Sequence, residues 1–560
     1  MTVDFEGRCH AFATALEEAL QTEYTPVFST TPCLASVGTA LTGLVALLTA
    51  SAAIAIPGSA GPRVGGIGLA LAGTLAYGTW VAPDVVASFR RRTAAGGTPE
   101  LVAYAVLQAR LTPSLERAAR FAGQHAGGDL GRSLARLTTG ATTGRSGWER
   151  FAEEWSEFDE SLPRSVSLLV AGIESAPPAR DALLDRALQT VLAGSRDRVA
   201  SFASAVRAPA TGIYAFGVML PLALVGLLPV AASAGVGVSP AGIAVLYDGV
   251  IPIGLLGASA WLAARRPAVS RPPTGVDALR SPRSLTLTGA LVGGTAVATA
   301  VLARAVFPGW TTWILVPGVS LGVGIVYWFD PVRERRESVQ NIETGVPDAV
   351  TLVGHRLAAG DPLETAVAVV GERLTGETAA VFRTATTRHR RLRITMAEAF
   401  TGSVGALEPY ASPRTETAIA LIEAAARNGT DGGETLVTVS SYLRELDAVE
   451  REARRELART TGTLRQTALV FGPAIAGVTV ALATGMGALG DTGQAVSVPA
   501  LGVVVGGYVL ALAVVLPALS VVLERGLDGA LVGYRIGVAL ATASTVYPVT
   551  FLAARTVVQV

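Results

Sequence analysis

One stretch of the sequence, PDAVTLVGHRLAAGDPLETAVAVVG from Pro347 to Gly371, has a counterpart elsewhere in the chain. An earlier stretch of equal length, PELVAYAVLQARLTPSLERAARFAG, runs from Pro99 to Gly123 and aligns with it without a gap. The alignment pairs Pro99 with Pro347, Val102 with Val350, Leu115 with Leu363, Glu116 with Glu364 and Gly123 with Gly371. The repeat predicts an internal duplication, with one related domain in each half of the chain.

The composition is that of a membrane protein. Of the 560 residues, 50% are apolar and only 16% are charged, whereas soluble proteins carry about 25% charged residues. The net charge of +1 gives no bulk attraction to nucleic acid. The two cysteines, Cys9 and Cys33, are too few for a disulfide framework or a CxxC metal site.

Runs of about 20 apolar residues predict nine membrane spans. The predicted spans are 33–56, 65–86, 209–233, 243–264, 284–304, 309–329, 467–489, 499–522 and 530–553. A charged segment of about 30 residues precedes the first span, so this span is not expected to be a cleavable signal peptide. Two long polar segments lie between the spans, at 87–207 and 330–465.

Arginines near the span ends predict which side of the membrane each segment occupies. The polar segments begin with Arg90–Arg92 and Arg333–Arg336, and the connector 265–283 is also rich in arginine. The positive-inside rule therefore places both polar segments and the N-terminus in the cytoplasm and the C-terminus outside. The predicted parts are a cytoplasmic segment 1–32, spans 33–86, cytoplasmic domain 87–207, spans 208–264, linker 265–283, spans 284–329, cytoplasmic domain 330–465, spans 466–522, and a last span within 523–560.

Both polar domains read as helical bundles, so the predicted fold is an all-α polytopic membrane protein. Gly360 can end one helix, and the next is expected to start with Asp361 as cap, Pro362 in the first turn and Glu364 completing a capping box. Thr112 and Pro113 are expected to start the corresponding helix in the earlier copy.

The stretch RNGTDGGETL predicts a helix break at Gly429 and a new start near Glu434. From there apolar residues recur at three- and four-residue spacing, as in an amphipathic helix that continues into the span at 467. These residues are Leu436, Val439, Leu443, Leu446 and Val449.

The sequence offers little for catalysis, and we expect no catalytic residue, cofactor or metal. A Walker A loop requires lysine, which the chain lacks, and the four histidines show no metal-ligand spacing. GVSLG, at Gly318–Gly322, matches a nucleophile motif, but it lies in a predicted span, where small residues let helices approach closely. Asp248 is either an interfacial or pore-facing acid or a coupling-ion site.

One run of cations has two interpretations. RTATTRHRRLR contains five arginines and no acid, which suits either a solvated helix face or a docking patch for an acidic partner. The arginines are Arg383, Arg388, Arg390, Arg391 and Arg393.

Paired spans, a helical domain and paired spans, all duplicated, resemble the platform proteins of type IV pilus-like machines, the type II secretion system F family. The likeness is nearest to the archaeal pilus and archaellum members, and it is best over 347–465. In the first domain IESAPPARD replaces RNGTDGGE and lacks its glycines, so that copy has diverged.

The resemblance implies a non-catalytic protein of the cell membrane that couples a hexameric cytoplasmic ATPase to the insertion of pilin or archaellin subunits during filament assembly. It also implies a homo-oligomer, possibly a dimer. The arginine run would then be a candidate ATPase-docking site. The alternative from another class is a repeat-containing secondary transporter or permease, whose binding site would lie at broken helices near the bilayer midplane.

Overall fold

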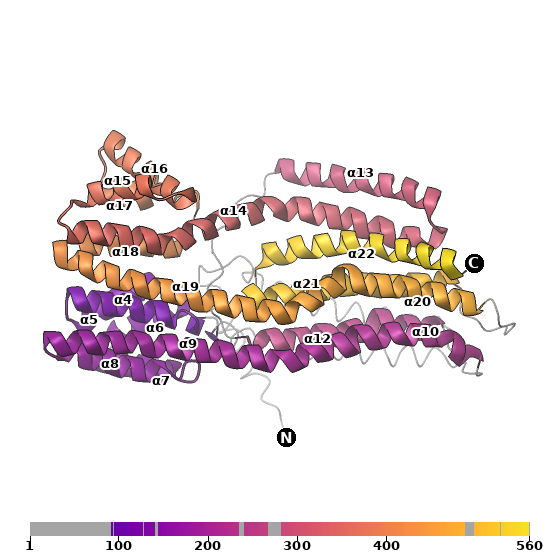
Figure 1. Ribbon diagram of the computed structural model, residues 1–560, viewed down its shortest axis with the longest axis horizontal. Coiled ribbons are helices and arrows are strands. Elements are labelled where there is room, and N and C mark those ends of the chain that lie inside the picture. The colour runs from indigo at the N-terminus through magenta and orange to yellow at the C-terminus, as the bar shows by residue number, and fades with distance from the viewer. Residues whose placement is uncertain are drawn as a thin grey trace, which may run out of the picture. The chain divides into compact units, whose positions relative to one another are not determined.

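A computed structural model describes residues 91–92, 94–126, 128–139, 144–233, 240–266, 282–410, 412–487, 498–526 and 528–558. The chain divides into two compact units, Met1–Arg92 and Thr93–Val560. The elements described below all belong to the second unit (Figure 1). The predicted N-terminal segment, the spans 33–56 and 65–86, and most of the linker 265–283 lie outside the described residues.

The described chain is helical and contains no strand. Seven of its helices are long and apolar enough to cross a membrane. They are Pro177–Leu228, Gly242–Ala264, Thr286–Val306, Gly309–Ala358, Gly429–Ala483, Pro499–Arg525 and Gly529–Val557. Each of them contains most or all of one predicted span from 209–233 onward, so the protein is an all-helical polytopic membrane protein.

The first helical domain comprises the short helices that precede α9, together with the N-terminal part of α9 (Pro177–Tyr214). These short helices are α4 (Thr98–Leu111), α5 (Leu115–Ala126), α6 (Gly128–Thr139), α7 (Gly144–Trp155) and α8 (Leu162–Glu174). Trp148 and Phe151 of α7 are completely buried and fill the centre of the domain together with Leu101 and Leu107. The apolar faces of its short amphipathic helices thus close on one core.

The second helical domain joins the C-terminal part of α14 (Thr312–Ala358) to the N-terminal part of α19 (Gly429–Gln466). Four shorter helices lie between them: α15 (Leu363–Arg373), α16 (Gly376–Leu392), α17 (Met396–Thr401) and α18 (Pro413–Ala426). The predicted amphipathic stripe of α19, from Leu436 to Val449, is buried, which confirms that prediction. Figure 1 shows α15, α16 and α17 grouped beside the end of α14.

The predicted caps of α15 and α5 are wrong, although the helices themselves exist. Gly360 adopts φ +87° and ends α14 as expected, but Pro362 is the N-cap of α15 and no side chain caps this helix. The Asp361 carboxylate instead pairs with Arg356 at 3.2 Å. In the earlier copy Thr112 is the C-cap of α4, and the hydroxyl of Ser114 accepts from the amide of Arg117 at the start of α5.

The stretch after α18 also differs from its prediction. A helix does end near Gly429, which adopts φ +61°, but α19 begins at this residue and not at Glu434. The glycines that suggested a break let helices cross closely instead. A Cβ at Gly433 would lie 2.8 Å from the carbonyl oxygen of Gly354 in α14.

Three helices run from the helical domains into the apolar part of the protein, as Figure 1 shows for α9, α14 and α19. Two of them change pitch on the way. After α9 comes a π-helical segment, η1 (Ala215–Met219), and then α10 (Leu220–Ser233). After α19 comes the π-helical η4 (Thr467–Phe471), and then α20 (Gly472–Gly487). The predicted continuity of α19 into its span is thus confirmed, with an added local π turn.

The remaining apolar helices are α11 (Pro240–Ala244), η2 (Val245–Val250), α12 (Ile251–Ala264), α13 (Pro282–Val306), η3 (Gly309–Thr311), α21 (Val498–Arg525) and α22 (Gly529–Val558). The Gly318–Gly322 motif serves packing, because a Cβ at Gly322 would lie 2.7 Å from the backbone of Ala541 in α22. Its serine, Ser320, is buried and donates to the Val316 carbonyl of its own helix at 2.5 Å.

Candidate functional site

Four of the five predicted arginines belong to α16 (Gly376–Leu392), and the fifth, Arg393, follows its last residue. Arg393 is the C-cap of this helix and adopts φ 54°, the one non-glycine residue with positive φ in the described chain. Its amide donates to the His389 carbonyl at 3.0 Å, and the His389 ring contacts the Ile394 carbonyl at 2.8 Å. Cations at a helix C-terminus are stabilised by the helix dipole, which explains part of their presence here.

Two of the five arginines are engaged within the domain. The guanidinium of Arg383 donates to the Gly371 carbonyl at 2.9 Å, and that of Arg388 donates to the Val404 carbonyl at 2.5 Å. They hold α16 against α15 and against the loop after α17. These two side chains therefore have a structural task.

The other three, Arg390, Arg391 and Arg393, are exposed. None of the five arginines forms an ion pair with a carboxylate of the described chain. Leu392 and Val404 lie in the same region and are 53% and 54% exposed. The end of α16 thus presents unpaired positive charge beside apolar side chains, which we call the α16 tip (residues 390–393 with Val404).

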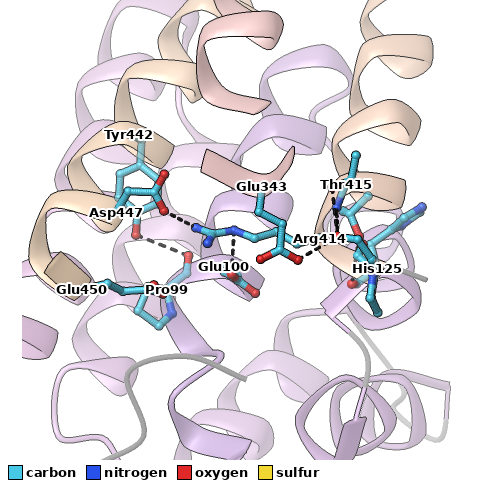
Figure 2. A network of polar contacts seen from close by, with 12 residues as sticks. Pro99, Glu100, His125, Glu343, Arg414, Thr415, Tyr442, Asp447 and Glu450 are labelled. Carbon is cyan, nitrogen blue, oxygen red and sulfur yellow. Dashed lines mark hydrogen bonds and ion pairs between the residues drawn. The ribbon is translucent and has the colours of Figure 1, made fainter. Parts of the chain in front are cut away.

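A second polar site, which was not predicted, lies between the two helical domains (Figure 2). Arg414 of α18 donates to Asp447 of α19 at 2.6 Å and lies 3.5 Å from the Glu100 carboxylate of α4. The hydroxyl of Ser412 donates to Glu343 of α14 at 2.7 Å. Figure 2 shows the Arg414 side chain between these acids. One guanidinium thus ties together helices from both domains.

The network continues along α19. Glu450 is buried and pairs with Arg454 at 3.4 Å, one turn further along the helix. The Tyr442 hydroxyl donates to the Pro99 carbonyl of α4 at 3.3 Å. Four carboxylates, from Glu100, Glu343, Asp447 and Glu450, therefore surround two guanidiniums, from Arg414 and Arg454.

Burial and the surrounding charges shift the pKa values of this site. Burial raises the pKa of Glu450 to about 7, even though Arg414 and Arg454 lower it. Burial also raises the pKa of Glu343, against the hydrogen bond from Ser412. Burial alone would lower the pKa of Arg414, but the surrounding carboxylates raise it above its ordinary value. The site therefore favours a bound proton on Glu450 near neutral pH.

Sequence reasoning missed this network because its members are far apart in the chain. A usable signal was the proline-arginine pair at the start of one helix in each copy, Pro163–Arg164 in LPRSV and Pro413–Arg414 in SPRTE. Arg414 lies inside that repeat, but its counterpart Arg164 is exposed, so the repeat alone did not reveal the network. No such repeat includes the four acidic residues of the network.

Asp248 belongs to η2 and is exposed at the surface of the apolar helices. Among the residues that the structure describes, no group of three His, Cys, Asp or Glu side chains could hold a metal ion. No family model matches the chain, and neither a curated protein nor a solved structure matches it significantly.

Proposed function

We propose that this protein is the membrane platform of a type IV pilus-like, archaellum or secretion machine. In this role the two helical domains face the cytoplasm, receive a hexameric ATPase, and transmit its motion to pilin subunits in the membrane. The protein is a mechanical element in this proposal and catalyses no reaction of its own.

One long helix joins each domain to the membrane, and these two helices are the observation that carries the proposal. Helices α9 and α19 are 38 residues each, and each continues through a five-residue π segment into an apolar helix. Arg196 of α9 donates to Glu445 of α19 at 2.8 Å, and Arg207 donates to Glu456 at 3.2 Å. Braced helices of this length are what a protein needs to carry displacement from one end to the other.

Parallels between the domains support the duplication that the proposal includes. Gly128 and Gly376 start α6 and α16, and both adopt positive φ. Ser161 and Ser412 are the N-caps of α8 and α18. The long helices and π segments then follow in the same order in both copies.

The α16 tip supports the ATPase side of the proposal. Exposed single charges contribute little to binding, about 0–1 kcal/mol each, but a cluster can steer association and set orientation. We expect Arg390→Glu combined with Arg391→Glu to weaken ATPase binding about tenfold or more and to stop filament assembly. The loss should shrink as salt rises, because exposed charges are screened beyond about 8–10 Å.

The matched control is Arg117→Glu combined with Arg120→Glu, two exposed arginines of α5 in the first domain. Both variants should be inserted and folded, and the control should bind a hexameric secretion ATPase of the source organism like the parent. Pull-down of that ATPase at low and high salt distinguishes them. Normal recruitment and filaments in the α16 variant would sink the docking assignment, and the absence of any ATPase interaction would sink the platform proposal.

A further inference from the structure

Asp248 and Arg304 are charged residues on membrane-facing surfaces, and neither has an ion pair with another described residue. Asp248 lies in η2, and Arg304 lies in the last turn of α13. A charged side chain within a membrane is costly unless it pairs or reaches water. Asp248 therefore calls for water or a cation that the described part of its own chain does not supply, and Arg304, in the last turn of α13, is a cation that a second copy of the chain can offer.

The two residues do not pair within one chain. Helix α13 packs against α14 and η3, whereas η2 packs against α11, α12 and α21. Figure 1 shows α12 and α13 at opposite edges of the apolar helices. A salt bridge between Asp248 and Arg304 therefore requires two molecules.

Their depths in the membrane match. Val292 of α13 packs on Gly324 of α14, at the position that a Cβ would occupy. Because the two helices run antiparallel, moving toward the end of α13 corresponds to moving toward the start of α14, and Arg304 lies level with Thr312. Two residues deeper, Ile314 packs against Gly506 of α21, with its Cγ1 2.6 Å from the position of a Cβ. The next residue of α21, Gly507, packs against Asp248, whose Oδ1 would lie 2.8 Å from a Cβ. At about 1.5 Å per residue the two charges differ in depth by about 5 Å, which an arginine side chain spans.

The surfaces around both charges suit contact with another helix. Val297 and Val301 on α13 are 67% and 66% exposed, and Val250 beside Asp248 is 49% exposed. A Cβ at Gly293 or Gly294 of α13 would meet nothing within 4 Å. Open glycines allow close approach of a second membrane helix.

We propose that a second copy of this chain packs its α13 face against the η2–α12 face, with Arg304 of one copy paired to Asp248 of the other. Because the two faces differ, the contact is head-to-tail and closes into a ring if the rotation between copies permits. The inference uses only membrane helices, so it does not rest on the proposed ATPase docking.

Disulfide cross-linking in native membranes tests the contact. In a background with Cys9→Ser and Cys33→Ser, one tagged copy carries Val250→Cys and a second carries Val301→Cys. Oxidation should link the two tags when both copies are expressed together, and neither variant expressed alone should form dimers. No linkage in the mixture, or equal linkage in one variant alone, overturns the head-to-tail arrangement. So does linkage of the cysteine introduced at position 250 to a cysteine placed within residues 33–86 of its own chain.

Charge exchange tests the salt bridge itself. Asp248→Arg and Arg304→Asp should each reduce cross-linking at least tenfold, and combining them in one chain should restore it. Restoration cannot come from a misfolded protein, so the combination keeps the test informative. The control is Arg555→Asp in the last turn of α22, which lies beyond the level of the Trp310–Phe551 contact and should change nothing. A combined variant as weak as the single ones would refute the pairing.

Discussion

The guanidinium of Arg196 lies 2.8 Å from the Glu445 carboxylate and joins two helices across a sequence separation of 249 residues. Arg207 and Glu456 repeat the contact at 3.2 Å and at the same separation. A constant separation along both helices means that α9 and α19 run parallel with one register. The two arginines lie on one face of α9 and the two glutamates lie on one face of α19, so the charged faces of the two helices lie against each other.

We expect each of the two exposed ion pairs to contribute little to the free energy of unfolding. Exposed ion pairs contribute about 0–1 kcal/mol each, so Arg196→Glu should lower the free energy of unfolding by no more than about 1 kcal/mol. Adding Glu445→Arg should recover most of the loss. Thermal unfolding of the purified protein in detergent measures both. A loss of several kcal/mol, or no recovery in the exchanged pair, would contradict the assignment of these residues to a solvent-exposed brace.

The close crossing at Gly433 gives a larger prediction. A side chain there would press on the carbonyl of Gly354 and on the backbone of Ala358. Gly433→Val should therefore destabilise the second helical domain by about 1–3 kcal/mol, the usual cost of overpacking.

Gly462, in the same helix, is the matched control because a Cβ there meets nothing within 4 Å. Gly462→Ala should raise the free energy of unfolding by about 0.5–1 kcal/mol through helix propensity. Hydrogen exchange of α19 amides would report both changes. Equal behaviour of the two variants would mean that the glycines do not serve packing.

The Gly433 crossing also shows where sequence reasoning ends. The seven spans from 209–233 onward and the stripe from Leu436 to Val449 were predictable because each is a local pattern of apolar residues, a long run in the spans and a helical period in the stripe. Glycines are ambiguous, since the same residue ends a helix at Gly360 and admits a neighbouring helix at Gly433. Only the neighbouring helix distinguishes the two roles, and no local pattern encodes it.

The predicted caps were wrong, and the buried network was missed, for related reasons. Asp361 has the right spacing for a capping box, but Arg356 lies within reach and takes the carboxylate. A true capping box forms at Thr395 and Glu398, where no cation of the described residues pairs with the glutamate. The Arg414 network depends on four helices meeting, so only its repeated arginine was visible in advance. In α16 the sequence indicated the five arginines, and the structure distinguishes Arg383 and Arg388, which donate to backbone carbonyls, from the three arginines of the α16 tip.

Removal of the central cation should be more costly than removal of one acid. Arg414→Met leaves Glu100, Glu343 and Asp447 without their shared guanidinium, and breaking a buried pair costs about 3–5 kcal/mol. Glu100→Gln removes one of the competing charges and keeps Asp447 as the nearest partner of Arg414, so its effect should be within about 1 kcal/mol. Chemical unfolding of both variants measures the difference. A mild effect of Arg414→Met would show that the acids are already neutral or hydrated.

The proton held by Glu450 makes stability depend on pH. The pKa of this carboxyl rises from 4.5 to about 7 on folding, mainly because the side chain is buried. Between these values the folded protein keeps a proton that the unfolded chain has released, so the free energy of unfolding falls as pH rises from about 4.5 to about 7. The charged groups that act on Glu450 are Glu100 from α4, Arg414 from α18, and Asp447 and Arg454 from α19.

Glu450→Gln copies the protonated form and cannot lose a proton. The variant should match the parent near pH 5 and exceed it at pH 8 by roughly 1–3 kcal/mol, because a shift of one pKa unit corresponds to about 1.4 kcal/mol. Glu452→Gln is the control on the same helix, since the Glu452 side chain is 72% exposed, and it should keep the pH dependence of the parent. Unfolding in urea at pH 5, 6, 7 and 8 resolves the three proteins. If Glu450→Gln loses stability with rising pH as steeply as the parent does, the proton resides elsewhere in the network, and Glu343 is then the next carboxyl to replace.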